Sequence, residues 1–287
     1  YTKMTNNISS EQIRILRDKT GAGIMDCKKA LLENSGDIEV SIDWLRKKGI
    51  SSAEKKSSRV ASEGLVGVSN QGKLCCLLEV NSETDFVSKN TEFQEFVNKL
   101  LKLDIKSKNT LEDFMNIAFN DNESVDQALK NIVAKIGENI VIRRLVYLSN
   151  DDGQYAFGSY IHNKINKKLG KMACIIKLKT LSSSEEVTSL ANKIAMHITA
   201  SKPLAINESD LSPELISKER EIFVAQLKES GKPDNIIEKI VEGKIKKFLS
   251  EVTLINQNWI IDPSHKVKDI INTFNEKNNS NIAIADF

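Results

Sequence analysis

The first 50 residues carry apolar side chains at the spacing of short helices. Residues 9–12 form a capping-box pattern that begins a first helix. A second helix is predicted over about residues 24–33, and an Asn-Ser-Gly stop signal follows it. From Ile38 onward, apolar residues at the i, i+4 and i+7 positions predict a third helix that ends near Gly49. The pattern predicts a compact three-helix docking module over residues 1–50.

Residues 51–60 have a different character from the module before them. They are polar, basic and rich in serine, which is typical of a linker or of an exposed helix. We interpret them as a linker between the module and the rest of the chain.

The remaining chain contains a weak internal duplication. Glycine turns at Gly72 and Gly170 each precede an apolar run with high β propensity. Each copy has a first strand, a glycine turn that leads into a second strand, a helix and a closing strand. In the first copy these four segments are residues 65–68, 72–80, 91–103 and 139–142. In the second copy they are residues 157–162, 170–178, 184–200 and 281–284. Two β-β-α-β units in tandem are therefore predicted, each with its sheet covered on one face by helices.

An additional helical pair interrupts the second copy. Pro213 suits the first position of a helix, and residues 230–233 suit a turn before a return helix. Because both helices carry an apolar stripe, we predict an antiparallel hairpin over about residues 208–250. Such a hairpin either protrudes to serve contacts or packs on its own domain, and the sequence gives the two alternatives even weight.

These elements predict an α+β fold with four parts. The predicted boundaries are a three-helix module at 1–50, a linker at 51–60, a first core subdomain at 61–150 and a second at 151–287 that contains the hairpin.

The charge balance narrows the class of partner. The chain has 41 lysines and arginines against 39 acidic residues, so the formal net charge is +2. A dedicated nucleic-acid binder normally has a marked basic excess. We therefore expect a protein partner or a small ligand, and no direct binding to nucleic acid. No apolar segment approaches the ~18 residues of a membrane span, so no membrane association and a cytoplasmic location are expected.

The search for catalytic chemistry finds no strong motif. No phosphate-binding Walker loop, dinucleotide fingerprint or zinc-protease motif is present, and no Cys-x-x-Cys pair occurs among the four cysteines. His162, His197 and His265 lie far apart in sequence, and we expect no metal site and no cofactor. A cysteine-histidine nucleophile pair stays open, although buried thiols that behave as small hydrophobic groups explain the pattern better.

One segment after a predicted strand has two interpretations. Residues 81–90 contain Ser82, Asp85 and Phe86 immediately before the next helix. In the first, favoured on physical grounds alone, Ser82 and Asp85 mimic a cap and Phe86 enters the core. In the second, Asp85 and Phe86 form an exposed acidic and aromatic pair on a rigid turn that anchors a partner.

An ordered series of motifs resembles the elongation factor Ts family. Residues 16–31 resemble its N-terminal signature, and residues 79–87 resemble its second signature. Further similar segments follow in the same order, at residues 135–140, 159–162, 197–203, 230–233, 242–248 and 251–254. The resemblance extends over nearly the whole chain, so it is far more specific than any single motif.

The resemblance implies a fold and a function. The family combines a ubiquitin-associated-like module, two related core subdomains and a helical hairpin. Its members are guanine nucleotide exchange factors, not enzymes, that bind elongation factor Tu in its GDP-bound and nucleotide-free states. They disturb the magnesium and phosphate site of Tu and promote GDP release during translation elongation. The implied assembly is a Ts–Tu heterodimer or heterotetramer.

The resemblance also implies which residues contact Tu. In the N-terminal module they are Arg17, Ile24 and Met25. In the second signature the contact segment is Thr84, Asp85, Phe86 and Val87, of which Asp85 and Phe86 match the pair that intrudes beside the magnesium of Tu. In the second subdomain the matching contact is His162.

The sequence departs from the family pattern in three places. Residues 163–168 replace a shorter, glycine-containing turn and change the setting of His162. Asn258 and Trp259 stand where a Pro-Phe pair is common. Many relatives continue past the position of Phe287 into a helix that grips Tu; either this protein is shorter or the sequence is truncated there, and a chain without that helix is expected to bind Tu less tightly.

Three other classes of function make different predictions. A stand-alone interaction module does not need an exposed Asp85 and Phe86. A cysteine-dependent enzyme requires Cys76 or Cys174 in a cleft near a histidine, with a lowered thiol pKa. A ribosome-associated or RNA-associated factor requires RNA binding that weakens steeply with salt.

Overall fold

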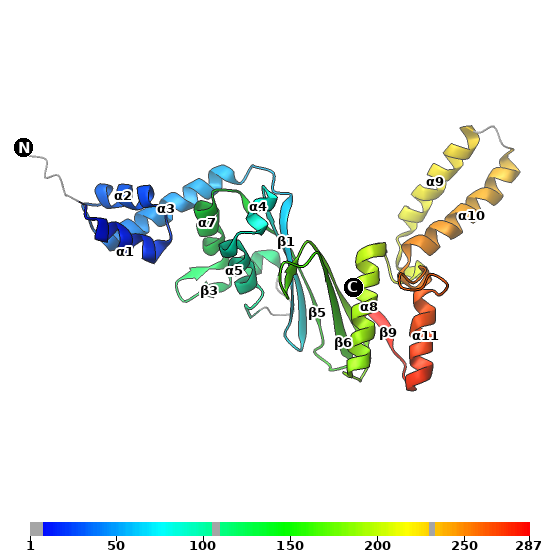
Figure 1. Cartoon of the computed structure of the whole chain (residues 1–287). Coiled ribbons are helices and arrows are strands. Elements are labelled where there is room, and N and C mark those ends of the chain that lie inside the picture. Colours follow the sequence, from blue (N-terminus) through cyan, green and yellow to red (C-terminus); the bar gives the residue numbers. More distant parts are fainter. Residues whose placement is uncertain (1–7, 105–109, 230–232) are drawn as a thin grey trace, which may run out of the picture. The chain divides into compact units, whose positions relative to one another are not determined.

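The computed structural model describes residues 8–104, 110–229 and 233–287 of the chain (Figure 1). Helices and strands are both abundant, so the predicted α+β class is confirmed. The chain forms two compact units. The first comprises Tyr1–Ser69, Leu77–Val146 and Lys164–Lys171, and the second comprises Asn70–Cys76, Tyr147–Asn163 and Met172–Phe287.

The first unit begins with three helices, α1 (Ser10–Thr20), α2 (Ile24–Glu33) and α3 (Ile38–Lys56). The predicted capping box is present, because the Gln12 N–H donates to the Ser9 hydroxyl and the Ser9 N–H donates to the Gln12 side chain. The core between the helices is formed by Leu16, Cys27, Ala30 and Leu31.

Helix α3 is longer than the sequence predicts. The predicted end near Gly49 is wrong, and so is the predicted linker over its first part, because the helix continues through Gly49 to Lys56. A Cβ on Gly49 would lie 3.4 Å from the Ala134 Cβ of α7 (Val125–Ile136), so this position lies against α7. Tertiary contact there overrides the weak helix propensity of glycine.

The first unit also contains a four-stranded sheet. Its strands are β1 (Glu63–Asn70), β2 (Leu74–Ser82), β5 (Ile140–Ser149) and β7 (Leu169–Gly170), in the order β5-β2-β1-β7. Between β2 and β5 the chain forms α4 (Asp85–Ser88), α5 (Thr91–Leu100), α6 (Leu111–Asn116), the small pair β3 (Ala118–Asn120) and β4 (Glu123–Ser124), and α7. The buried side chains of these helices include Phe93, Phe96, Val97, Leu100, Phe114, Val125 and Val133.

The second unit contains a three-stranded antiparallel sheet. Its strands are β6 (Tyr155–His162), β8 (Met172–Lys179) and β9 (Ala283–Asp286), in the order β6-β8-β9. Helices α8 (Glu185–Ser201) and α11 (Val267–Asn278) supply much of its core, which includes Leu190, Ala191, Ile194, Ile198, Val267 and Ile271. Contact between α8 and β6 is close, because a Cβ on Gly158 would lie only 2.4 Å from the Ala191 Cβ.

The two sheets share an arrangement of strands. In each, the strand that closes the unit pairs with the second strand of the unit and not with the first. Thus β5 lies beside β2 in the first sheet, and β9 lies beside β8 in the second.

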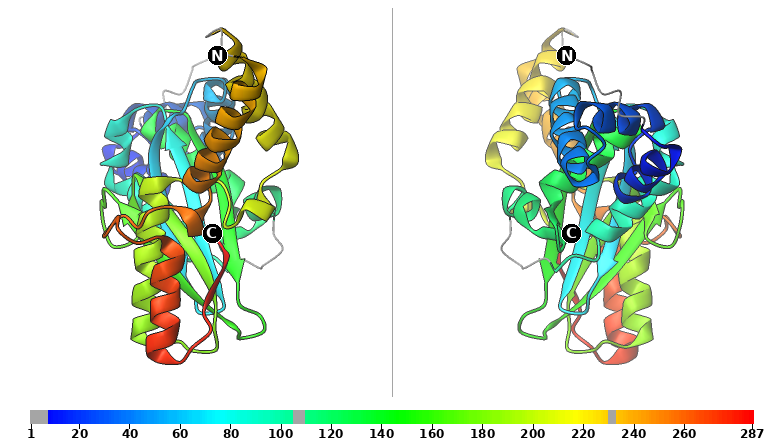
Figure 2. Two further views of the ribbon diagram at one scale, coloured as in Figure 1. Left: turned by 90° about the vertical axis from the view of Figure 1, so that its right-hand side faces the viewer. Right: turned by 90° about the vertical axis from the view of Figure 1, so that its left-hand side faces the viewer.

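A helical hairpin extends from the second unit. Helices α9 (Pro213–Glu229) and α10 (Asp234–Val252) lie side by side, away from α8 and α11 (Figures 1 and 2). Short 3₁₀ helices precede and follow the pair, at Glu208–Asp210 and Leu254–Asn256. The hairpin has its own apolar core of Leu227, Ile237, Val241 and Ile245. Of its predicted turn, residues 230–232 lie outside the described residues.

None of the helices in the described part of the chain combines the length and the apolar character that crossing a membrane requires.

Candidate partner-binding surface

The turn after β2 presents an acidic and an aromatic side chain on the surface. Asp85 is exposed, and the Phe86 side chain is 74% exposed at the start of the short helix α4. The interpretation in which Phe86 enters the core is therefore wrong. Its capping contact is also absent: the N-cap is Thr84, and the Ser82 hydroxyl donates to the Thr84 carbonyl.

Val87 has the opposite environment from Phe86. It is only 5% exposed, and the neighbouring Ser88 is 1% exposed. Successive residues of a helix point about 100° apart, so one turn of α4 directs Phe86 outward and Val87 inward. The Val87 side chain is therefore placed to hold the turn from inside, and it is not available on the surface as a contact.

Two residues that follow α7 brace the turn. The Thr84 N–H and hydroxyl donate to the two carboxylate oxygens of Glu138, at 2.9 and 2.7 Å. The Asn139 N–H donates to the Glu83 carboxylate at 2.6 Å. Hydrogen bonds to an ionised group are stronger than those between neutral partners, so these contacts fix the turn firmly.

The bracing residues are themselves held in place. Gly137 ends α7 in the left-handed conformation, with φ of 88°, which redirects the chain toward the turn. The buried Asn139 side chain then donates to the Arg59 carbonyl at 2.7 Å. Resemblance marked residues 135–140 as a family motif but gave them no role. The only signal in the sequence that these residues have a role was a pair of polar residues directly after a glycine that stops a helix.

The surface electrostatics around Phe86 are mixed. The Lys89 ammonium lies 5.9 Å from the centre of the Phe86 ring, within cation–π range. Among the described residues, no ion pair involves the Asp85 carboxylate. The turn thus offers an unpaired acid beside an apolar ring with a cation at its edge.

The predicted contacts of the N-terminal module are also on the surface. Ile24 and Met25 begin α2 and are 54% and 75% exposed, and Arg17 is exposed on α1. Gly21 shapes the loop between these helices, with φ of 66° and an N–H that donates to the Arg17 carbonyl at 2.7 Å. A large apolar pair with this exposure is typical of a binding surface.

The loop of the module contacts the same helix that leads to the brace. A Cβ on Gly21 would lie 2.9 Å from the Lys135 ammonium, on the last turn of α7. Lys135 also pairs with Glu92 of α5 at 2.6 Å. Lys135 therefore contacts both the loop that precedes Met25 and the helix that follows Phe86.

His162 belongs to the second unit, at the end of β6. It is exposed, and its Nδ1 lies 3.2 Å from the Tyr160 hydroxyl. The next residue, Asn163, has φ of 49°, so the chain turns sharply at the start of the segment that departs from the family pattern.

The buried cysteines do not have the environment of a nucleophile. Burial raises the pKa of Cys75, Cys76 and Cys174 to about 12, so these thiols stay protonated at neutral pH. The hypothesis of a cysteine-dependent enzyme required a lowered pKa at Cys76 or Cys174 and is contradicted. Within the described residues, no group of three or more histidine, cysteine or acidic side chains could hold a metal ion.

His197 has a structural environment. It is fully buried and stacks on Trp259, with ring centres 5.3 Å apart. Its Nδ1 accepts from the Ile260 N–H at 3.2 Å, so Nε2 carries the proton toward the Gln257 side-chain oxygen at 2.9 Å. Burial lowers the pKa of His197, and the neutral ring therefore fits this site.

Comparisons with known proteins agree on one family. The family model described as Elongation factor TS matches residues 83–286. The elongation factor Ts of Rhizobium etli is 45% identical over 259 residues, which cover 90% of this chain and 83% of the relative. The elongation factor Ts of Rickettsia felis is 42% identical over 282 residues, which cover 98% of this chain and 90% of the relative.

The family model covers well over half of the chain, and the relatives match it almost from end to end. The chain belongs to the elongation factor Ts family.

Proposed function

We propose that this protein is a guanine nucleotide exchange factor that releases GDP from elongation factor Tu during translation elongation. Family membership supports the activity and the partner. The single observation that carries the proposal furthest is the pair formed by Asp85 and the 74% exposed Phe86, held on a braced turn. The activity is a shift in binding equilibria and includes no covalent step.

The turn acts as a wedge. In a GTPase of this kind, magnesium and a phosphate-cradling loop neutralise the charge of the diphosphate. A carboxylate and an aromatic ring pushed against that site displace the metal or shift the loop, so GDP loses charge-assisted contacts. A wedge must not yield when it is pressed, and the contacts of Thr84 and Glu83 with residues 138–139 supply that stiffness.

The direction of exchange follows from linkage. If this protein binds nucleotide-free Tu more tightly than GDP-bound Tu, reciprocity requires that it weaken GDP binding by the same factor. Incoming GTP then displaces the exchange factor through the same coupling, which returns it to another GDP-bound Tu.

The remaining contacts hold Tu while the wedge acts. We assign Arg17, Ile24 and Met25 to docking on the nucleotide-binding domain of Tu, because the two apolar side chains are large and exposed. His162 contacts another domain of Tu from the second unit. Val87 has the indirect role of supporting the turn. The three-helix module is ubiquitin-associated-like, and the two sheets descend from one duplicated subdomain.

The test measures release of a fluorescent GDP analogue from the matching Tu, with and without this protein. Wild-type protein accelerates release, and Asp85→Ala combined with Phe86→Ala reduces the acceleration at least about tenfold, or about 1.4 kcal/mol in the barrier. The matched control combines Asp151→Ala with Leu181→Ala, which removes an exposed acid and an exposed apolar residue from the second unit.

Each outcome has a separate meaning. If the variant at Asp85 and Phe86 loses the acceleration of GDP release and the control variant keeps it, the wedge is supported. If both variants accelerate release equally and still bind Tu, Asp85 and Phe86 do not form the wedge. Absence of both binding and acceleration in the wild-type protein contradicts the proposed function itself.

A further inference from the structure

A glycine in the middle of α10 has no structural reason within this chain. Apart from its chain neighbours and the adjacent backbone of its own helix, a Cβ built on Gly243 would have no atom of the described residues within 4 Å. Gly72, Gly137 and Gly153 also face open space, but their φ values of 81°, 88° and 72° explain the glycines there. Gly243 lies in a regular helix, where glycine is the poorest residue apart from proline.

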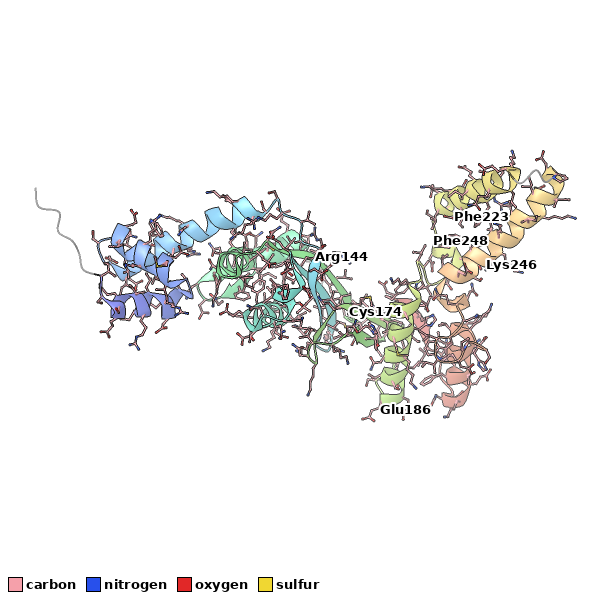
Figure 3. All side chains as sticks on the ribbon, turned by 45° about the horizontal axis from the view of Figure 1, so that its top comes forward. Arg144, Cys174, Glu186, Phe223, Lys246 and Phe248 are labelled. Carbon is pink, nitrogen blue, oxygen red and sulfur yellow. The ribbon has the colours of Figure 1, made fainter. Side chains whose placement is uncertain are left out.

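The glycine lies on the outward side of the hairpin. Val241 and Ile245, two residues away on either side, are buried in the hairpin core. Lys239, Lys246 and Lys247 stand at i−4, i+3 and i+4 from Gly243, so they share its face of the helix. All three lysines are exposed, and Lys246 is labelled in Figure 3. A flat gap in a helix surface is thus surrounded by ammonium groups.

Much of this positive charge is uncompensated. The Glu242 carboxylate, next to Gly243 in sequence, pairs with Arg220 of α9 at 2.6 Å. On the other flank, Glu251 lies 3.7 Å from Lys247. Among the described residues, Lys239 and Lys246 form no ion pair, so two free cations stand on either side of Gly243 along the helix.

An apolar residue continues the same face. Ile236 is two helical turns before Gly243 and is 45% exposed. The aromatic residues of the hairpin lie elsewhere: Phe223 and Phe248 are half-buried, and Phe223 packs on the hairpin core. A surface for nucleic acid would gain from stacking aromatic rings and would gain nothing from Ile236. The combination favours a protein ligand over RNA.

We propose that the α10 outer face, defined by Ile236, Lys239, Gly243, Lys246 and Lys247, binds an acidic amphipathic α-helix of a partner protein. Without a side chain at Gly243, the backbone of the partner helix comes closer than the 8–10 Å between ordinary packed helices. Carboxylates along one edge of that helix pair with Lys239 and Lys246, and an apolar residue covers Ile236. This site is separate from the wedge at Asp85 and Phe86.

The first measurement asks whether Gly243 serves the fold. Gly243→Ala in the full chain should raise the urea midpoint of helix loss, followed by circular dichroism, because alanine favours the helix and its Cβ meets nothing. A midpoint that falls or stays unchanged would mean that the glycine has a role inside the chain, and the proposal would be overturned.

The second measurement uses a defined ligand. The probe is a dye-labelled helical peptide of about 20 residues, about 30 Å long, with glutamates along both edges of an alanine and leucine stripe. A second peptide has glutamine in place of every glutamate. Fluorescence anisotropy should show saturable binding of the glutamate peptide to the wild-type protein and at least tenfold weaker binding of the glutamine peptide.

Variants then locate the site. Two variants should each bind the glutamate peptide at least tenfold more weakly than the wild type. One combines Lys239→Glu with Lys246→Glu, and the other is Gly243→Leu. The matched control is Lys218→Glu with Lys228→Glu, which makes the same charge change on exposed residues of α9 and should alter the affinity less than twofold.

Three results overturn the proposal. The first is no saturable binding of the glutamate peptide, or equal weakening by the control. The second is tighter binding of an RNA duplex that depends on the same lysines, which makes the face a nucleic-acid site. The third is slower GDP release from Tu in the α10 variants, which makes Tu itself the occupant. None of these results bears on the variant at Asp85 and Phe86, so the two proposals fail independently.

Discussion

Phe86 and Val87 are adjacent apolar residues with opposite environments, one on the surface and one in the interior. Composition does not tell which of the two is buried, because either could fill the same space. Two contacts distant in sequence decide it: Glu138 holds Thr84, and Asn139 holds Glu83. Physical reasoning on the turn alone favoured burial of Phe86 and was wrong. The residues left presentation of this ring to a partner open as an alternative, and the family resemblance favoured it.

A second residue-scale consequence concerns pH. The folded state lowers the pKa of His197, while the unfolded chain keeps it near 6.5. Below pH 6.5 the unfolded chain therefore binds a proton that the folded chain resists, and the free energy of unfolding falls as the pH falls. Above pH 6.5 both states are neutral, and the contribution of His197 to stability is fully present. Urea unfolding of the wild-type protein between pH 7.5 and 5 should show this loss, expected within the ordinary range of histidine titration.

The control for that measurement is His197→Gln. An amide can accept from the Ile260 N–H and donate toward Gln257, yet it does not titrate. The variant should lose less stability than the wild type over the same pH range, even if it is less stable at pH 7.5. Identical slopes for the two proteins would show that other groups carry the pH dependence.

Among the elements, long periodic segments were predicted well and short ones were not. The bounds of α2 match the predicted residues 24–33, and α9 begins at Pro213 as expected. The short β3 and β4 gave no usable pattern, because two or three residues carry no periodicity. The end of α3 was misplaced because Gly49 indicates a stop locally but a packing contact in the fold.

Replacing glycine by alanine should have opposite effects on stability at positions 158 and 243. Gly158→Ala in β6 places a Cβ 2.4 Å from the Ala191 side chain and 2.5 Å from its backbone. Because α8 must move to make room, the free energy of unfolding should fall by about 1–3 kcal/mol. Gly243→Ala adds the same methyl group in open space and should raise stability by up to about 1 kcal/mol. Urea denaturation of both variants measures the contrast, and destabilisation by Gly243→Ala or stabilisation by Gly158→Ala would contradict it.

At the scale of the whole molecule, the cysteines report on the two units separately. Cys27 lies in the core of the N-terminal helices, in the first unit. Cys75 and Cys76 lie on β2, a strand that both units share, and Cys174 lies on β8 of the second unit. Burial raises the pKa values of these three thiols to about 12. Each thiol can react only after its surroundings open, since the thiolate is the reactive form.

Iodoacetamide at pH 8 should therefore leave the native protein unmodified and its nucleotide exchange activity intact. In increasing urea, mass spectrometry of the peptides should show Cys27 reacting with the opening of the first unit and Cys174 reacting with the opening of the second. Cys75 and Cys76 should react when β2 opens. Rapid alkylation of any of them in the native protein would contradict the buried environment. Simultaneous reaction of all four would show instead that the units unfold as one.

The family and the order of the elements could be predicted from the sequence, because many motifs occur in the same order as in the family. The roles of Glu138 and Asn139 were not, because a brace is defined by the residue it touches, and Thr84 is 54 positions earlier. The segment around Gly243 was likewise marked only as similar to a family motif, at residues 242–248, and the sequence gave it no role. From the sequence alone, a glycine in a basic helix indicates only lower helix stability. The open space beside Gly243 is known only from the structure.

The distance between the wedge and its brace also matters during synthesis of the chain. Phe86 leaves the ribosome more than 50 residues before Asn139, yet the turn is fixed only once Glu138 and Asn139 are in place. A nascent chain that has emerged only as far as α7 therefore has the wedge sequence without its rigidity. If the turn acts on Tu as proposed, it can do so only after the first unit has closed.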